Sequence, residues 1–444
     1  MTRNQPVPNI AVRFLRWLLR LDCPVPERTD AQLAEETSRN YSWNFAVNLS
    51  DAALFWLGSS LVSSTTVLPL FVSKLTPSPL AIGMISVISQ GAWFLPQIFV
   101  ANFTERVPRR KAMVVNLGLF LERLPMVLLV LAALAAPRSA GLALALFFTG
   151  YAVHGLGAGA VGAAWTDLIA RCFPVERRGR FFGITMFIAA IMGVGGAALS
   201  AWLLRVLPYP TSFLTIFSIA TGFVMLSWIA ISLTREPVPS VRPPRVSNRE
   251  YLRGIPEILR SDRNFRRFVL TRALMAASAM GSGFLTVSAL SRWQVADSTV
   301  GIYTAVLLIG QTGGNLAFGV LADRFGHKLS LQLGATAGVL GYALAWLAPG
   351  PGWAFAAFLM VGVVSSSVLV SGMLIVMEFS APERRPTYIG LANTVTGIAG
   401  ALAPLVGAAL ASVSYEWLFA VCTALYAMTA VLYRWWVREP RFAE

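Results

Sequence analysis

The sequence predicts an all-α membrane protein whose twelve transmembrane helices form two pseudo-symmetric six-helix bundles. Three observations predict this class: an apolar composition, about twelve long apolar runs, and loop motifs that recur in the second half of the chain. Of the 444 residues, 56% are hydrophobic and 13% are charged, whereas a soluble chain carries about a quarter charged residues. Lipid can solvate the apolar helix faces that this composition leaves uncovered.

The long apolar runs are expected to be helices, because a helix satisfies its own backbone hydrogen bonds inside hydrocarbon. A spanning helix needs roughly 20 apolar residues to cross ~30 Å. The expected spans are 45–72, 78–103, 112–136, 141–166, 181–207, 212–234, 268–291, 298–322, 328–348, 352–379, 386–412 and 415–436. Their connections are mostly short, so neighbouring helices should run antiparallel.

One long interior gap, rich in proline and arginine, divides the spans into two sets of six. The expected units are an N-terminal arm (1–40), an N-terminal bundle (41–234), a central loop (235–267), a C-terminal bundle (268–436) and a tail (437–444). Within the arm, apolar residues from Ile10 to Leu21 share one helix face and arginines share another. This pattern predicts an amphipathic helix in the membrane interface. Thr29 and Gln32 then predict a capping box that opens a second short helix.

The basic residues predict the orientation. By position, 30 of the 36 lysines and arginines fall in the arm, the tail, the central gap and alternate loops. Because basic loops stay in the cytoplasm, we expect both termini to be cytoplasmic and the protein to lie in the cell (plasma or inner) membrane. The net charge of +15 is then explained by topology, and no nucleic-acid partner is expected.

Motifs for other function classes are missing from the sequence. The three cysteines are scattered, the two histidines exclude an HExxH site, and there is no GxxxxGK[ST] loop. Gly157–Gly162 matches GxGxxG but lies inside an apolar span with no preceding strand, so it predicts close helix packing instead. We therefore expect no cofactor, no metal site and no enzymatic activity.

Three pairs of segments match between the two halves. They are 101–110 with 319–328, 174–178 with 382–385, and Arg235-Glu236-Pro237 with Arg438-Glu439-Pro440. Each pair lies at equivalent loops of the two sets of spans. This is the signature of an internal repeat.

The segment 319–328, GVLADRFGHK, resembles the G-x-L-a-D-R-x-G-R-[RK] loop of the major facilitator superfamily. The copy at 101–110 is degenerate, with Ala101, Glu105 and Pro108 at the first glycine, the aspartate and the second glycine. The resemblance covers nearly the whole chain. It implies a transporter of the major facilitator type, in which the two halves give alternating access to a site between them.

By this resemblance the two loops would form a conformational latch at the cytoplasmic side. Gly319 would permit close helix approach and Gly326 a tight turn. Asp323 would meet the start of the fifth helix near Arg180, and Glu105 would meet the start of the eleventh. The latch residues are Glu105, Arg106, Arg109, Arg110, Gly319, Asp323, Arg324, Gly326 and Lys328. The alternative is that these charges only fix topology and loop shape.

Ionisable residues inside spans are costly and mark candidates for function. Asp51, about 9 Å into the first span at ~1.5 Å per residue, is a candidate to bind a proton or a cationic group; capping a neighbouring helix is the alternative. His154 suits proton coupling because an ordinary histidine pKa is near 6.5, although a packed histidine is an equal reading. Arg272 either snorkels to the surface or interacts with charges such as Asp51.

Uncharged polar residues complete the set of candidates. The candidates for the substrate or proton pathway are Asn44, Asn48, Asp51, Gln90, Trp93, His154, Arg272, Gln311 and Asn315. The pairs on the second and eighth spans would either bind substrate or join helices. Glu122 and Arg123, in the middle of the third span, are expected to form a buried structural network. Adjacent helical residues point about 100° apart, so they need not pair with one another.

The sequence therefore predicts a secondary active transporter for a small organic solute, with protons as a candidate coupling ion. The expected partners are the solute and the lipid bilayer, and the expected state is a monomer. The alternative is a transporter-like receptor or scaffold that binds a ligand without translocating it. Substrate identity and direction of transport stay open.

Overall fold

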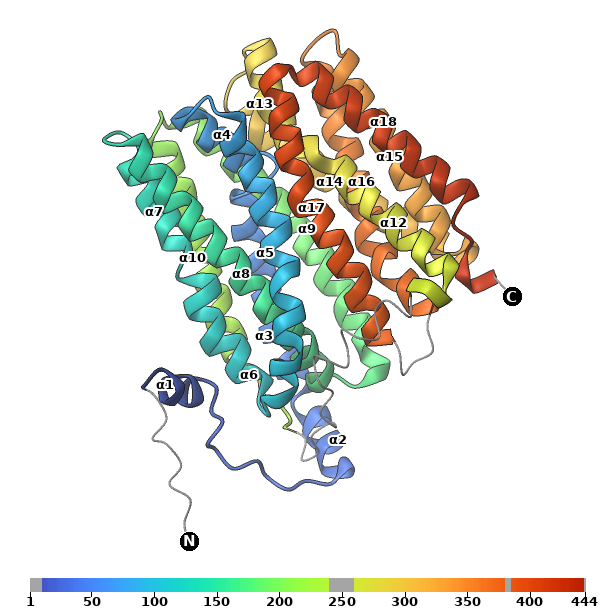
Figure 1. The fold of residues 1–444 in the computed structure, drawn as a ribbon. Coiled ribbons are helices and arrows are strands. Elements are labelled where there is room, and N and C mark those ends of the chain that lie inside the picture. The colour runs from blue at the N-terminus through green and yellow to red at the C-terminus, as the bar shows by residue number, and fades with distance from the viewer. Residues whose placement is uncertain (1–9, 239–258, 380–384, 443–444) are drawn as a thin grey trace.

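The computed structural model describes residues 10–238, 259–379 and 385–442, and these residues form helices and loops without a β-strand. The helices run lengthwise in one bundle (Figure 1). The N-terminal half contains α3 (Tyr41–Leu61), α4 (Val67–Leu75), α5 (Pro79–Arg106), α6 (Arg110–Ala112), η1 (Met113–Leu117), η2 (Leu119–Arg123), α7 (Met126–Ala135), α8 (Ala140–Cys172), α9 (Val175–Val206) and α10 (Thr211–Ser232). The C-terminal half contains α12 (Arg263–Ser278), η3 (Ala279–Gly281), α13 (Ser282–Trp293), α14 (Thr299–Phe325), α15 (His327–Leu347), α16 (Gly352–Glu378), α17 (Arg385–Val413), α18 (Tyr415–Trp435) and η5 (Pro440–Phe442).

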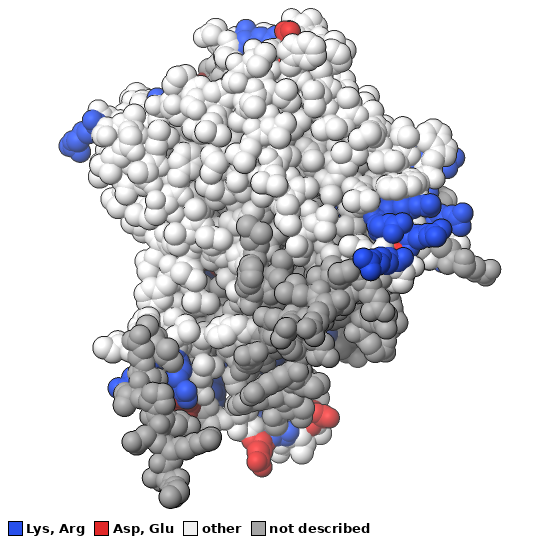
Figure 2. Space-filling model, in the orientation of Figure 1, with Lys and Arg blue, Asp and Glu red and all other residues white. Residues whose placement is uncertain are grey.

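Ten helices among the described residues are long and apolar enough to cross a membrane. They correspond to the third to twelfth predicted spans. The second span is α5, whose shorter apolar stretch is Pro79–Phe94, and the first is α3 followed by α4. The predicted twelve-helix class is thus confirmed. Figure 2 shows charged side chains at the margins of the visible face and a broad uncharged surface between them.

The first predicted span, 45–72, is not one continuous helix. It breaks between α3 and α4, within the run Ser63-Ser64-Thr65-Thr66. Hydroxyl side chains offer the backbone alternative hydrogen bonds, so they weaken a helix interior. Here the amides of Thr66 and Leu68 both turn to the carbonyl of Ser63, at 3.3 and 3.0 Å. The break frees polar groups of this segment for contacts with the other half.

The third predicted span, 112–136, contains two π-helical segments, η1 and η2, before it continues as α7. A π-helical turn contains one more residue than an α-helical turn, and such turns are frequent at functional sites. Glu122 and Arg123 lie in η2, and both are buried. Two adjacent ionisable residues are therefore buried together in this π-helical segment.

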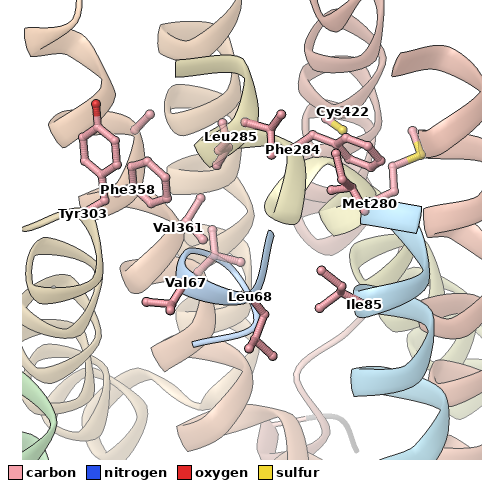
Figure 3. Packing of buried hydrophobic residues seen from close by; sticks show 14 of the residues in the cluster. Val67, Leu68, Ile85, Met280, Phe284, Leu285, Tyr303, Phe358, Val361 and Cys422 are labelled. Atoms are coloured by element: carbon pink, nitrogen blue, oxygen red, sulfur yellow. The ribbon is translucent and has the colours of Figure 1, made fainter. Parts of the chain in front are cut away.

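Helices of each half pack mainly on one another, and two helix pairs form the most extensive contacts between the halves. In the N-terminal half α3 packs on α9 and α10, and α8 on α5 and α7; in the C-terminal half α16 packs on α14 and α15, and α12 on α17 and α18. Between the halves α5 packs on α17 and α9 packs on α14. Figure 3 shows part of the buried core, to which α4 contributes Val67 and Leu68 and α13 contributes Phe284 and Leu285.

The described part of the N-terminal arm lies against the N-terminal half, below α6 in Figure 1. Helix α1 (Ile10–Leu18) leads to Leu19, which is fully buried in a cluster with Val107 and Met113. The amide of Asn116 donates to the carbonyl of Leu18 at 2.6 Å. Helix α2 (Asp30–Arg39) opens with the predicted capping box of Thr29 and Gln32. We call the end of the molecule that carries this arm the basic end, and the other the far end.

Candidate functional site

Polar contacts between the two halves gather at the far end. Thr66 and Thr304 place their hydroxyl oxygens 2.5 Å apart, and both residues are buried. The hydroxyl of Thr286 donates to the carbonyl of Thr65 at 2.9 Å. The ammonium of Lys74 lies 2.8 Å from the carboxylate of Asp297. The halves are therefore joined at this end through the broken segment between α3 and α4.

Close backbone packing extends this junction toward the middle of the bundle. A Cβ on Gly83 of α5 would lie 2.9 Å from the carbonyl oxygen of Pro404 of α17, and one on Gly301 of α14 would lie 2.4 Å from the backbone nitrogen of Ala201 of α9. Near mid-helix, Gly397 of α17 meets the side chain of Phe94. Glycine is required at such contacts because a methyl group would not fit.

The expected latch is not formed between described residues at the basic end. Asp323 and Arg180 are both exposed, and the Asp323 carboxylate has no hydrogen bond or ion pair with a described residue. Only its backbone carbonyl is engaged, by Arg441 at 3.2 Å. The side chains of Glu105 and Arg106 lie outside the described residues. Their predicted contact with the eleventh helix therefore stays a prediction.

The two glycines of the 319–328 motif behave differently from one another. Gly326 has a φ of +85° and closes the tight turn between α14 and α15, as expected; a Cβ there would lie 2.3 Å from a Glu439 carboxylate oxygen. A Cβ on Gly319 would meet nothing within 4 Å, so the expected close helix approach at Gly319 is wrong in this structure. Gly310 and Gly314 make that approach instead, against Leu359 and Ser366 of α16.

Arg109 and Arg110 form hydrogen bonds with partners in the N-terminal half, to which they belong. The Arg109 guanidinium donates to the carbonyls of Cys23 and Pro24 in the arm, at 3.1 and 2.7 Å. Buried Arg110 donates to the Asp167 carboxylate at 2.5 Å, and Arg171 donates to the same oxygen at 2.9 Å. The structure thus places two of the proposed latch residues in contacts within the N-terminal half. These contacts hold the arm to the loop between α5 and α6, and that loop to α8.

Glu236, just after α10, caps the start of α6. Its carboxylate accepts hydrogen bonds from the backbone N–H groups of Arg110 at 2.9 Å and Lys111 at 3.0 Å, and from the Arg171 guanidinium at 3.1 Å. Negative charge at a helix N-terminus is stabilised by the unpaired N–H groups there. Burial nevertheless raises the pKa of Glu236 above its ordinary value, against these donors.

The C-terminal half repeats this cap. Glu439 follows α18 and accepts from the backbone N–H of Lys328 at 2.8 Å, at the start of α15. Arg441 donates to the Glu378 carboxylate at 2.6 Å, and Glu378 also lies 3.8 Å from the imidazole of His327. The Arg-Glu-Pro repeat seen in the sequence is therefore a pair of equivalent helix caps.

Intramembrane charges of the N-terminal half form one buried group. The sequence leaves the pairing of Glu122 with Arg123 open, and in the structure the two side chains form an ion pair. The Arg123 guanidinium also lies 5.5 Å from the ring centre of Phe55. His154 donates from Nδ1 to the carbonyl of Glu122 at 2.6 Å, and Asp51 accepts from the Ser227 hydroxyl at 2.6 Å. Four helical segments, α3, η2, α8 and α10, supply these residues.

The other candidates are dispersed. Asn44 binds the Arg235 backbone at 2.9 Å and Asn48 binds Thr234 at 3.1 Å, both buried within the N-terminal half. Gln90 and Trp93 are exposed on α5, where Gln90 lies near Gly400 of α17 and the ring of Trp93 lies near Gly162 of α8. Gln311 and Asn315 are half-buried on α14. The structure does not bring these six residues into one cluster.

Arg272 is buried in the C-terminal half, with 7% of its surface exposed. It does not snorkel to the surface, which removes that reading. Its Nη2 donates to Asn393 Oδ1 of α17 at 3.1 Å. Sequence reasoning missed Asn393 and also Asn264, which exchanges hydrogen bonds with the Arg438 backbone at 3.0 and 2.9 Å as Asn44 does with the Arg235 backbone.

The first two of the three glycines in the GxGxxG match pack closely, as predicted. A Cβ on Gly157 would lie 2.2 Å from the carbonyl oxygen of Leu121 in η2, and one on Gly159 would lie 2.4 Å from that of Ala92 in α5. Helix α8 therefore approaches two neighbours at backbone contact. This is the geometry of small residues at membrane helix interfaces.

The sequence is similar to known proteins along both halves of the chain. The family model described as Major Facilitator Superfamily matches residues 52–294 and 286–444. An uncharacterized MFS-type transporter, MJ1317, of Methanocaldococcus jannaschii is 22% identical over 82% of this chain and 88% of its own. The thioclapurine efflux transporter tcpA of Claviceps purpurea is 26% identical over 32% of this chain, a match that spans 26% of that protein.

Solved structures share the fold at low sequence identity. A variant of the nucleoside transporter NupG superposes with a TM-score of 0.68 at 13% identity, over 87% of this chain and 99% of that one. The D-xylose-proton symporter gives 0.64 at 15% identity, over 90% and 99%. With the two halves, their repeated loops and the match along the chain established, one conclusion follows: this protein is a multi-pass membrane protein that belongs to the Major Facilitator Superfamily.

Proposed function

We propose that this protein is a secondary active transporter that moves a small organic solute by alternating access between its two halves. The observation that carries the proposal is the uneven junction between the halves. Hydroxyl and charge contacts join them at the far end, through Thr66 with Thr304 and Lys74 with Asp297, whereas Asp323 and Arg180 at the basic end are exposed and apart from one another. An arrangement closed at one end is one of the two states that alternating access requires.

We propose further that the basic end faces the cytoplasm of the cell in which the chain resides, in the plasma or inner membrane. The concentration of arginine in the arm and the alternate loops supports this orientation. The division into an arm, two bundles and a central loop at 235–267 belongs to the same proposal, as does a monomeric state. In this orientation the structure is the inward-facing state.

Protons are the proposed coupling ion, with Asp51 and His154 as the groups that carry them. Asp51 is buried, and its described hydrogen bond comes from a neutral donor, Ser227. With Nδ1 of His154 donating to the carbonyl of Glu122, its Nε2 is left as the nitrogen that gains or loses a proton. Buried titratable groups at membrane depth are typical of proton pathways.

The test begins with ligand binding and ends with flux. Detergent-purified full-length protein is screened by its thermal unfolding midpoint against metabolites, and a solute that raises the midpoint is then offered to proteoliposomes. Transport predicts accumulation that depends on an imposed proton gradient and is lost in Asp51→Asn and His154→Gln variants that still bind the solute. Binding without flux in the unmodified protein would contradict transport and support a receptor or scaffold.

A further inference from the structure

Arg272 is a buried cation without an anionic partner among the described residues. Only Nη2 is engaged, by the neutral amide oxygen of Asn393 at 3.1 Å. The Nε and Nη1 atoms are buried and donate to nothing in the described part of the chain. Leaving a charge buried and unpaired costs several kcal/mol, and intramembrane arginines normally pair with an acid or a backbone carbonyl. The site therefore lacks an acceptor.

The C-terminal half offers no internal acid to fill that role. Its described acidic residues sit at helix ends or in loops, and those that form ion pairs contact other bases: Asp297 contacts Lys74, Glu416 contacts Arg292, and Glu378 contacts Arg441. This differs from the N-terminal half, where Arg123 is paired with Glu122. One intramembrane arginine is thus neutralised by the protein and the other is not.

The surroundings of Arg272 add another donor and a glycine. Tyr433 of α18 is fully buried, and its hydroxyl has no partner in the described residues. A Cβ on Gly372 of α16 would lie 3.8 Å from Nη2 and 3.9 Å from Nε, so at this position a residue without a side chain faces the guanidinium. Donors without acceptors and a missing side chain fit a small bound anion.

The neighbouring helix face connects this group to the junction of the halves. Asn393, Gly397, Gly400 and Pro404 recur at intervals of four, three and four residues, so they share one face of α17. The last three of them contact Phe94, Gln90 and Gly83 of α5 in the other half. Asn393 lies one turn nearer the basic end and is half-exposed. Arg272 therefore lies directly behind a residue that faces the space between the halves.

From this geometry we infer that the solute is an organic oxyanion, carrying a carboxylate or phosphate group, and that Arg272 binds that group. The inference rests on the proposed transport function, since it names the substrate class of the same protein. Asn393 positions the guanidinium, and Tyr433 is the second donor. Because arginine matches planar oxyanions with charge-assisted hydrogen bonds, a neutral analogue of the same shape binds more weakly.

The test measures the thermal unfolding midpoint of full-length protein in detergent with sodium benzoate, succinate and glucose 6-phosphate, against benzamide, succinamide and glucose. We expect at least one anion to raise the midpoint by on the order of 2 °C and its neutral counterpart to have no effect. Arg272→Gln should abolish the rise. Arg266→Gln, which removes an exposed charge from the same helix, is the matched control and should retain it.

A second variant separates binding from folding. Asn393→Asp places a carboxylate where the Asn393 amide now accepts from Arg272, so it should keep the protein folded, raise the basal midpoint and exclude the added anion. A rise that persists in Arg272→Gln, or no rise with any of the three anions in the unmodified protein, would overturn the inference. Proteoliposome flux keeps the two proposals distinct: flux of a neutral solute without anion binding removes only this inference, and anion binding without flux removes only the transport function.

Discussion

Asn44 and Asn264 form the same reciprocal pair of hydrogen bonds in the two halves of the molecule. The Asn44 amide donates to the carbonyl of Arg235 and accepts from its N–H, both at 2.9 Å. Asn264 does the same with Arg438, at 3.0 and 2.9 Å. Each half therefore ties its first helix to the Arg-Glu-Pro segment that follows its last helix.

The two asparagines differ in burial, which predicts unequal effects of truncation. Asn44 is fully buried, whereas Asn264 is partly exposed, so water replaces the lost partner only at Asn264. We expect Asn44→Ala to cost about 2–3 kcal/mol and Asn264→Ala about 1 kcal/mol, read as thermal midpoints in one detergent. Equal losses of stability in the two variants would show that the difference in burial does not determine the effect of truncation. Loss of solute binding by Asn44→Ala without loss of stability would instead support Asn44 as a substrate residue.

The two capping glutamates allow a similar comparison. Glu236 accepts from two backbone N–H groups and from Arg171, whereas Glu439 accepts from the N–H of Lys328 and has one buried oxygen with no hydrogen-bond partner in the described part of the chain. Hydrogen bonds to a charged group contribute about 1.5–3 kcal/mol each. Glu236→Ala should therefore lower the unfolding midpoint clearly more than Glu439→Ala. The reverse order would show that the Glu236 cap at the start of α6 contributes less to stability than its hydrogen bonds indicate.

Close packing of α8 predicts that a glycine substitution there has a different effect from one at an open position of another helix. Gly157→Ala would force a methyl group to 2.2 Å from the Leu121 carbonyl oxygen, while Gly222 of α10 has nothing within 4 Å of such a group. Overpacking costs about 1–3 kcal/mol, and alanine gains up to about 1 kcal/mol over glycine in an open helix position. We expect Gly157→Ala to lower the midpoint and Gly222→Ala to leave or raise it. Thermal unfolding of the two variants side by side checks this.

The Lys74–Asp297 ion pair should bias the molecule toward closure at the far end. Both side chains are about one-third exposed, so the pair contributes about 0.5 kcal/mol, or roughly a twofold change in the equilibrium. The reporter is a Thr66→Cys substitution in a Cys23→Ser background, because Thr66 is fully buried in this state. Aqueous maleimide should label the cysteine at position 66 about twofold faster when Lys74→Asp is added than in the reporter alone.

The control exchanges both charges. Lys74→Asp with Asp297→Lys restores opposite signs and should return the labelling rate to that of the reporter alone. Salt screens exposed charges, so high ionic strength should reduce the difference between the variants. An unchanged rate in Lys74→Asp at low salt would show that the ion pair does not contribute to closure.

The sequence predicted the helices well because membrane helices are set by local composition. Apolar length alone located the spans, and the Arg-Glu-Pro repeat indicated that the segments after the sixth and twelfth spans are equivalent. The break before α4 was missed, since Ser63–Thr66 are compatible with a helix until contacts with Thr286 and Thr304 compete for their polar groups.

The arrangement of polar side chains was harder to predict. A helical wheel gives only the direction of each side chain from the helix axis, so it left the pairing of Glu122 with Arg123 in η2 open. Likewise, nothing local to Arg272 indicates that its partner is Asn393, 121 residues away. Tertiary packing decides which intramembrane charge is neutralised and which is left for a ligand.

The most direct test of alternating access is a reversible cross-link at the far end. Thr66→Cys with Thr304→Cys, in the Cys23→Ser background, places two thiols where hydroxyl oxygens are now 2.5 Å apart. The control pair is Ser278→Cys with Thr429→Cys, whose hydroxyls lie 3.5 Å apart within one half.

The measurement is flux, in proteoliposomes, of the solute that raises the unfolding midpoint. Alternating access predicts that oxidation of the Thr66–Thr304 pair stops flux, that a reductant restores it, and that the control pair has no such effect. Flux that continues through the oxidised Thr66–Thr304 pair would contradict the account, because the two halves would then not need to separate at the far end.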